Sequence, residues 1–330
     1  MSVPSFDAHV TVACQNTLGE GILWDDRTRR LHWVDIDRAE VHSYDPATKT
    51  HAAAHYAESE FVSALALRVG KPGLVAVTEA AVVIVEPPFP SGETEKHSGV
   101  TEEHSTHTIA APLAKEYVDN KLVRFNDGAC DARGRLWIGS MTRPERRDGR
   151  DRGELWRVGP DGSTTRFLEG VGTSNGIDWS PDNRLMYYID SGMNEVSVFD
   201  YDVEAGVPSN RRVFAPALAG PGVFDGLVVD GVGNVWVARW GDSRVVVFSP
   251  GGKMLAQVNT PGARSPTIPC FGGADLRTLY IATANANLAG QGDIQAQFPQ
   301  SGNVFGLDCS SMTDVLGPEW RGRVRHRFGG

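Results

Sequence analysis

Residues 176–189, Gly-Ile-Asp-Trp-Ser-Pro-Asp-Asn-Arg-Leu-Met-Tyr-Tyr-Ile, contain the unit that decides the fold. Two short apolar stretches flank a Pro-Asp-Asn turn, so the segment is typical of a strand, a tight turn and a second strand. Residues 226–237 and 128–138 repeat the pattern, with glycine in their turns. Weaker copies cover residues 21–34, 64–77 and 272–281, which makes six copies of one strand-turn-strand unit.

The copies recur at a spacing that is typical of propeller blades. Their second strands are centred near Trp33, Val75, Trp137, Tyr187, Trp236 and Tyr280. These markers lie roughly 40–60 residues apart, and a third apolar run follows most of them, as expected for blades of about four strands. Sustained helical periodicity is almost absent, which argues against a parallel barrel. We therefore predict an all-β fold, a six-bladed β-propeller with four-stranded blades around a central channel, in a single domain over residues 1–330.

The widest gap between copies separates the second blade from the third. We expect an insertion there over about residues 87–120, either a surface loop or a lid near the channel mouth. His97, His104 and His107 lie in this segment, and a solvated loop is favoured over a metal-binding tract. Two terminal segments, residues 9–13 and 324–328, both have a composition that could complete a blade.

The bulk composition excludes several classes of function. The formal net charge of −9 argues against a nucleic-acid partner, because phosphate binding needs a basic face. No apolar run of about 18 residues could span a membrane, and residues 1–10 lack the features of a secretory signal. We therefore expect a cytoplasmic protein without a membrane partner, a monomer or a weak homo-oligomer, with its four scattered cysteines reduced.

An oxygen-bearing side chain precedes glycine at the same point of four copies, as Glu20-Gly21, Asp127-Gly128, Asn175-Gly176 and Asp225-Gly226. Because the innermost strand of each blade lines the channel, we expect these side chains to converge at its mouth. Glu20, Asn175 and Asp225 offer hard ligands suited to Ca²⁺, Mg²⁺ or Mn²⁺, with Zn²⁺ and Fe²⁺ also acceptable. One such dipeptide is commonly only a turn. Three in register predict a divalent-cation site.

Blade three adds polar residues beside this predicted site. Arg124 and Asn126 could hold a polyol or an oxyanion by charge-assisted hydrogen bonds, and Asn126 rather than Asp127 is expected to face the substrate. In blade four, Asp190-Ser191 ends the second strand, and both a simple turn and a supporting role at the site remain open. The sequence contains no phosphate-binding loop or dinucleotide fingerprint.

These motifs together resemble the SMP-30/gluconolactonase/luciferin-regenerating-enzyme family of six-bladed propellers. The resemblance runs from about Leu18 to the blade around Tyr280. The matching stretches are residues 18–24 (Leu-Gly-Glu-Gly-Ile-Leu-Trp), 31–36, 124–128 (Arg-Phe-Asn-Asp-Gly), 134–141, 174–180, 188–191, 224–226 (Phe-Asp-Gly) and 270–273.

The resemblance implies hydrolysis of a small sugar lactone at a divalent cation held by Glu20, Asn175 and Asp225, with Ca²⁺ as the expected ion. It also implies that Arg124 and Asn126 contact the substrate. A Lewis-acid cation would stabilise the oxyanion that develops on the lactone carbonyl. Asp225, directly or through a water that it orients, would act as the catalytic base.

The sequence departs from the family pattern at two places. Phe224 stands where the family commonly has proline, and the acidic residue expected after the blade-three motif is Glu145, which we take as a substrate-binding candidate. Both places, together with residues 87–120, are where substrate selection is expected. Two alternatives therefore remain: a biosynthetic hydrolase or isomerase acting on a bulkier non-sugar lactone or ester, and a non-catalytic calcium-binding propeller.

Overall fold

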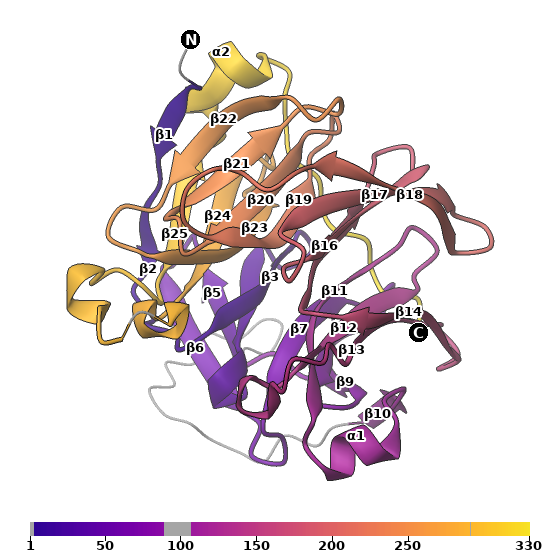
Figure 1. Ribbon diagram of the computed structural model, residues 1–330. Coiled ribbons are helices and arrows are strands. Elements are labelled where there is room, and N and C mark those ends of the chain that lie inside the picture. Colours follow the sequence, from indigo (N-terminus) through magenta and orange to yellow (C-terminus); the bar gives the residue numbers. More distant parts are fainter. Residues whose placement is uncertain (1–2, 89–106, 291) are drawn as a thin grey trace.

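Six β-sheets arranged around a common axis make up the molecule (Figure 1). The computed structural model describes residues 3–88, 107–290 and 292–330. Each sheet contains a blade of four antiparallel strands, one sheet has a fifth strand at its edge, and consecutive innermost strands lie side by side around the ring. The prediction of a six-bladed propeller is confirmed.

The first three blades follow one another along the chain. Blade one is β3 (Gly19–Asp25), β4 (Arg30–Asp35), β5 (Glu40–Asp45) and β6 (Thr50–His55); blade two is β7 (Val62–Leu67), β8 (Leu74–Thr78), β9 (Val82–Val85) and β10 (His107–Ala110); blade three is β11 (Val123–Cys130), β12 (Leu136–Thr142), β13 (Gly153–Val158) and β14 (Thr164–Val171).

The other three blades continue the same order. Blade four is β15 (Ser174–Trp179), β16 (Leu185–Asp190), β17 (Glu195–Asp202) and β18 (Val207–Ala215); blade five is β19 (Val223–Val229), β20 (Val235–Trp240), β21 (Arg244–Phe248) and β22 (Met254–Asn259); blade six is β23 (Ser265–Gly272), β24 (Thr278–Ala284) and β25 (Val304–Asp308), completed from the N-terminus.

Helices in the described part of the chain are short. They are α1 (Lys115–Asp119), α2 (Thr313–Leu316) and the 3₁₀ turns η1 (Ile36–Arg38), η2 (Pro144–Arg146), η3 (Ala286–Ala289), η4 (Gln295–Gln297) and η5 (Cys309–Met312). None of them has the length and apolar character needed to cross a bilayer.

The N-terminal segment closes the ring. Strand β2 (His9–Val12) pairs antiparallel with β25 as the outer strand of blade six, and β1 (Ser5–Asp7) adds a parallel fifth strand to blade five. The other candidate, residues 324–328, forms no strand and makes only isolated bridges, Cys130–His326 and Arg68–Phe328. The prediction that residues 324–328 could complete a blade is wrong, because β2 already occupies the outer edge of blade six.

The segment of residues 87–120 is partly regular. Strand β10 pairs with β9 as the outer strand of blade two, and α1 leads from it towards β11. The part of the predicted loop or lid at residues 89–106, with His97 and His104, lies outside the described residues.

The hydrophobic core is divided among the interfaces between neighbouring blades. One cluster, for example, joins Trp137 and Leu155 of blade three to Trp179 and Tyr188 of blade four. Large buried side chains there hold one blade against the next. The repeated apolar second strand is thus the sequence signal of this packing, since a blade covers both faces only by contact with its two neighbours.

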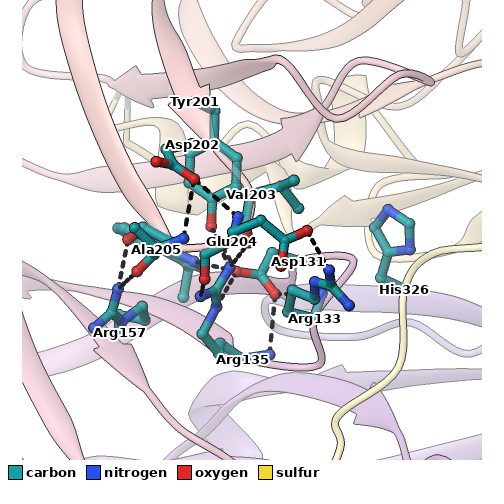
Figure 2. Close-up of polar contacts among 12 residues, drawn as sticks. Asp131, Arg133, Arg135, Arg157, Tyr201, Asp202, Val203, Glu204, Ala205 and His326 are labelled. Atoms are coloured by element: carbon teal, nitrogen blue, oxygen red, sulfur yellow. Dashed lines mark hydrogen bonds and ion pairs between the residues drawn. The ribbon is translucent and has the colours of Figure 1, made fainter.

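A polar network adds to the packing between blades three and four (Figure 2). Asp131, at the end of β11, accepts hydrogen bonds from Arg135 at 2.6 Å, from the indole of Trp137 at 3.3 Å and from the hydroxyl of Tyr201 in blade four. In blade five, Asp230 similarly accepts from Trp236 at 3.0 Å. This aspartate–tryptophan pair explains the Leu-Trp and Val-Trp dipeptides of the repeat, because the buried indole N–H needs an acceptor.

Candidate active site

The innermost strands share an irregularity near their starts, where the predicted site residues lie. The β-pairing register shifts between Glu20 and Leu23, and equivalent shifts occur in all six inner strands. Such a bulge re-aims a side chain relative to the regular strand. The glycines that follow are required there: Gly21 has a φ of +55°, and a Cβ at Gly176 would lie 2.5 Å from the amide nitrogen of Leu227.

At the equivalent point of each irregularity, directly before the glycine or the apolar stretch that follows, lies one buried polar residue per blade. The six are Glu20, Ser63, Asp127, Asn175, Asp225 and Thr267. The predicted trio is therefore placed on three inner strands at one level of the channel. Ser63 and Thr267 were not predicted from the sequence, because no glycine follows them. Their positions just before the apolar stretches of blades two and six were a signal that could have identified them. Their hydroxyls donate to neighbouring backbone carbonyls, at 3.2 Å to Val77 and 2.6 Å to Gly19.

The three carboxylates of this ring carry negative charge that the protein only partly balances. Glu20, Asp127 and Asp225 are 4%, 3% and 4% exposed. Burial and the charges of Asp225 and Asp127 raise the pKa of Glu20 well above its usual value, and burial and Asp127 do the same to the pKa of Asp225. One oxygen of Asp127, Oδ2, is buried without a hydrogen-bond partner among the described residues.

The side chain of Asn175 is oriented from two sides. Its Nδ2 donates to the Ser191 hydroxyl at 2.8 Å, and the same hydroxyl donates to the backbone carbonyl of Phe224 at 2.6 Å. Its Oδ1 accepts from Nδ2 of Asn126 at 3.0 Å. Ser191 therefore has the supporting role that the sequence left open, and Asn175 keeps a lone pair on Oδ1 for a further partner.

The donor set fits a hard divalent cation. Buried carboxylates with raised pKa values and a buried oxygen without a donor are the features expected where a cation compensates the charge. In the described part of the chain, no group of three or more His, Cys, Asp and Glu side chains forms a metal cluster by itself. The predicted set combines the carboxylates of Glu20 and Asp225 with the amide oxygen of Asn175.

Arg124 lies next to this cluster with its guanidinium buried. Its Nη1 donates to Oδ1 of Asn126 at 2.7 Å and to the Phe125 carbonyl at 2.9 Å, and the group lies 5.3 Å from the centre of the Phe61 ring. Burial lowers the pKa of Arg124, while the charges of Asp37 and Glu20 oppose that shift. Phe61 and Asp37 are neighbours that the sequence did not single out.

Three further charged residues, Glu145, Arg143 and Glu60, lie on this side of the site. Glu145 is exposed in η2, and its charge acts on Arg124, so the predicted substrate contact lies at the rim. Arg143 also lies over the Phe61 ring, at 5.0 Å, and pairs with Glu60 at 2.7 Å.

Phe224 does not line the site. Its side chain is fully buried and packs edge-on to Phe248 at 6.2 Å and under the guanidinium of Arg239 at 5.0 Å. The expectation that this residue takes part in substrate selection is therefore wrong for its side chain, because the strand directs it into the interface between blades four and five. Only its backbone supports the site, through the carbonyl bound by Ser191.

Comparison with known proteins agrees with the fold. Residues 18–285 match the family model described as the SMP-30/gluconolactonase/LRE-like region. The chain is 30% identical to pentonolactonase XacC of Haloferax volcanii over 96% of this chain and 97% of that protein. It is 32% identical to regucalcin of Xenopus laevis, over 87% and 89%. The crystal structure of regucalcin from Agrobacterium tumefaciens, described as a calcium-binding protein, superposes with a TM-score of 0.81 at 25% identity, covering 99% of each chain.

Proposed function

The chain belongs to the SMP-30/gluconolactonase/LRE-like family, and from this premise we propose that it hydrolyses a small sugar lactone to the hydroxy acid with the help of one divalent cation. The observation that carries the proposal is the ring of buried carboxylates at the channel mouth, with Arg124 beside it. A relative is named as a pentonolactonase, which supports a sugar-derived substrate.

Glu20, Asn175 and Asp225 are the residues that would hold the cation, with Ca²⁺ as the first candidate because of the calcium-binding relative and the oxygen-only donor set. When bound, a divalent cation would supply Lewis-acid polarisation of the lactone carbonyl.

Asp225 is the candidate general base. Burial keeps its carboxylate basic, as the raised pKa indicates, so it can accept a proton from an attacking water at one of its oxygens. Glu20 lies in the same environment, but the positive charge of Arg124 acts on Glu20 and not on Asp225, which is why we prefer Asp225 as the base.

Arg124 would hold the substrate through its remaining N–H groups, donating to ring or hydroxyl oxygens of the lactone. Asn126 has a different part. Both of its amide protons are already used, one on the Ser174 carbonyl at 2.9 Å and one on Asn175. It therefore positions Arg124 and Asn175, and only its carbonyl oxygen is left for a substrate hydroxyl. Glu145 would contact the part of the substrate nearest the rim.

The proposal is tested by a panel of lactones, from sugar lactones to aliphatic and aromatic ones, with spontaneous opening subtracted. We expect preference for the polyhydroxylated substrates and loss of hydrolysis in Asp225→Asn, while Asp242→Asn, in the same blade, stays active. Tight Ca²⁺ binding without hydrolysis of any lactone would instead support a non-catalytic calcium-binding propeller.

A further inference from the structure

The C-terminal segment, residues 319–330, covers the end of the channel away from the site. The proposed ligands lie near the starts of the inner strands, whereas this segment contacts the residues where those strands finish. In Figure 1 it is the yellow trace that leaves α2 and crosses the molecule to the C-terminus near β14.

The segment touches every blade along its path. It accepts a hydrogen bond from Gly231 of blade five at 3.3 Å, donates to Leu276 of blade six at 2.9 Å, and pairs Arg323 with Asp178 of blade four at 2.8 Å. Further on, Phe328 donates to Leu67 of blade two at 2.7 Å. The contacts that remain are Gly329 with Gly134 of blade three at 2.9 Å, and Arg327 with Asp26 of blade one.

Arg325 is the residue of this segment that reaches under the inner strands. Its Nη2 donates to the carbonyl of Leu227 in β19 at 2.7 Å, and its side chain lines a small cavity with Leu65, Ala129 and Cys130. Its Nε is buried without a hydrogen-bond partner within the described ranges. This half-buried guanidinium has no carboxylate in contact with it among the residues that the structure describes, in contrast to that of Arg323.

Two buried carboxylates of the site lie on the strands that Arg325 contacts, two residues earlier in each strand. Leu227 follows Asp225 by two positions in β19, and Ala129 follows Asp127 by two positions in β11. Two residues of a strand span about 7 Å. The backbone of each carboxylate is thus roughly this far along the strand from the residue that Arg325 contacts, and unlike charges on neighbouring groups in a partly buried channel attract. In agreement, the charge of Arg325 lowers the pKa of Asp127 against the effect of burial.

We propose that Arg325 is a built-in counter-charge beneath the site, which offsets the negative charge of Asp127 and thereby sets how tightly the site binds a divalent cation. Each cationic neighbour then has its own partner: Arg124 balances Glu20 from the side, Arg325 balances Asp127 from below, and Asp225 has neither. The cation-affinity part of this inference rests on the proposed function.

A counter-charge has two opposite consequences. It stabilises the cation-free protein, because buried carboxylates repel one another less. It also weakens cation binding, because a positive charge near the site repels the incoming ion. Removing the charge should therefore destabilise the cation-free protein and tighten cation binding, a combination that loss of a merely structural contact does not produce.

The experiment compares Arg325→Met and Arg325→Lys, with Arg323→Met as the matched control in the same segment. Melting temperature is measured in excess chelator, and the Kd for Ca²⁺ by titration calorimetry. We expect Arg325→Met to melt lower than wild type in chelator and to bind Ca²⁺ about tenfold more tightly. Arg325→Lys should retain wild-type values. Arg323→Met should melt lower without a change in Kd.

The Asp127→Asn background decides the assignment of the partner. There, adding Arg325→Met should change neither the melting temperature nor the Kd, because no charge is left to balance. If Arg325→Met changed the melting temperature and the Kd equally in the wild-type and Asp127→Asn backgrounds, the proposal would be overturned. Failure of both Arg325→Met and the double variant to fold would also overturn it. Recovery of folding in the double variant supports it. If the wild type binds no divalent cation, the proposed function fails, and the melting temperatures of the four proteins still decide the counter-charge.

Discussion

The side-chain amide of Asn126 donates a hydrogen bond of 3.0 Å to the side-chain oxygen of Asn175, the predicted amide ligand of the site. This contact links blade three to blade four directly at the channel mouth. The same residue accepts from Arg124, so one asparagine orients both the proposed cation site and the proposed substrate contact.

Removing that link should weaken the cation site without removing a ligand. For Asn126→Ala we expect a Kd for Ca²⁺ that is about 10–100-fold higher, as is usual for residues that orient metal ligands. Calorimetry measures the change, and Asn210→Ala, in the exposed part of β18, serves as the control. An unchanged Kd would show that Asn175 is oriented well enough by Ser191 alone.

The raised pKa of Glu20 predicts a pH dependence of stability. A carboxyl whose pKa is higher in the folded than in the unfolded protein binds an extra proton on folding between the two values. The cation-free protein should therefore gain stability from this group as the pH falls towards the ordinary pKa of 4.5, and lose it as the pH rises. Melting of wild type and Glu20→Gln in chelator, from pH 8 downwards, isolates this contribution.

The difference in melting temperature between Glu20→Gln and wild type should be largest at neutral pH, where the variant is the more stable protein. It should shrink in acid. With saturating Ca²⁺ the order should reverse, because the wild type alone has the full ligand set. A variant that is less stable than wild type at every pH in chelator contradicts the assignment of Glu20 to a charge-strained site.

Asp131 should contribute strongly to stability, because its carboxylate accepts from Arg135, Trp137 and Tyr201 at the blade interface. Asp131→Ala leaves these donors without their acceptor, at a cost of about 3–5 kcal/mol in free energy of unfolding. Denaturant unfolding measures it. Asp148→Ala removes an exposed carboxylate that pairs only locally with Arg152 and should leave the unfolding midpoint unchanged. Equal effects of the two substitutions would refute the role of the network.

Substitution of Phe224 should affect stability, whereas substitution of Phe61 should affect catalytic efficiency. Phe224→Leu is expected to lower stability by about 1–2 kcal/mol through imperfect repacking, with the ratio of kcat/KM between sugar and apolar lactones unchanged. Phe61→Leu should alter kcat/KM, since Phe61 lies against Arg124. A changed substrate preference in Phe224→Leu would return this residue to the specificity determinants.

Much of the architecture and the core of the site could be predicted from the sequence because both rest on local, repeated chemistry. The Asp-Gly and Asn-Gly dipeptides mark bulges that only glycine accommodates, and the aromatic second strands mark blade interfaces. Four of the six ring residues were found this way. Ser63 and Thr267 lack the glycine, so their equivalence became visible only with the paired strands.

What could not be predicted depends on contacts between segments far apart in the chain. Arg325 comes from a segment without strand periodicity, and its position beneath the inner strands follows from how the C-terminus crosses the channel. Phe224 was misplaced because a residue next to a site residue in an irregular strand can face either side. Two terminal segments had a composition that could complete the last blade. Only the observed pairing with β25 shows that β2 is the one that does so.

The most direct test of the central claim, that one divalent cation at Glu20, Asn175 and Asp225 supports lactone hydrolysis, is a titration of the cation-free protein. Bound cation and the rate of hydrolysis of the best sugar lactone are followed in the same samples. The account predicts that both rise together and saturate at about one ion per chain, with neither change in Asp225→Asn. Full hydrolysis by protein shown by elemental analysis to hold no divalent cation would contradict it.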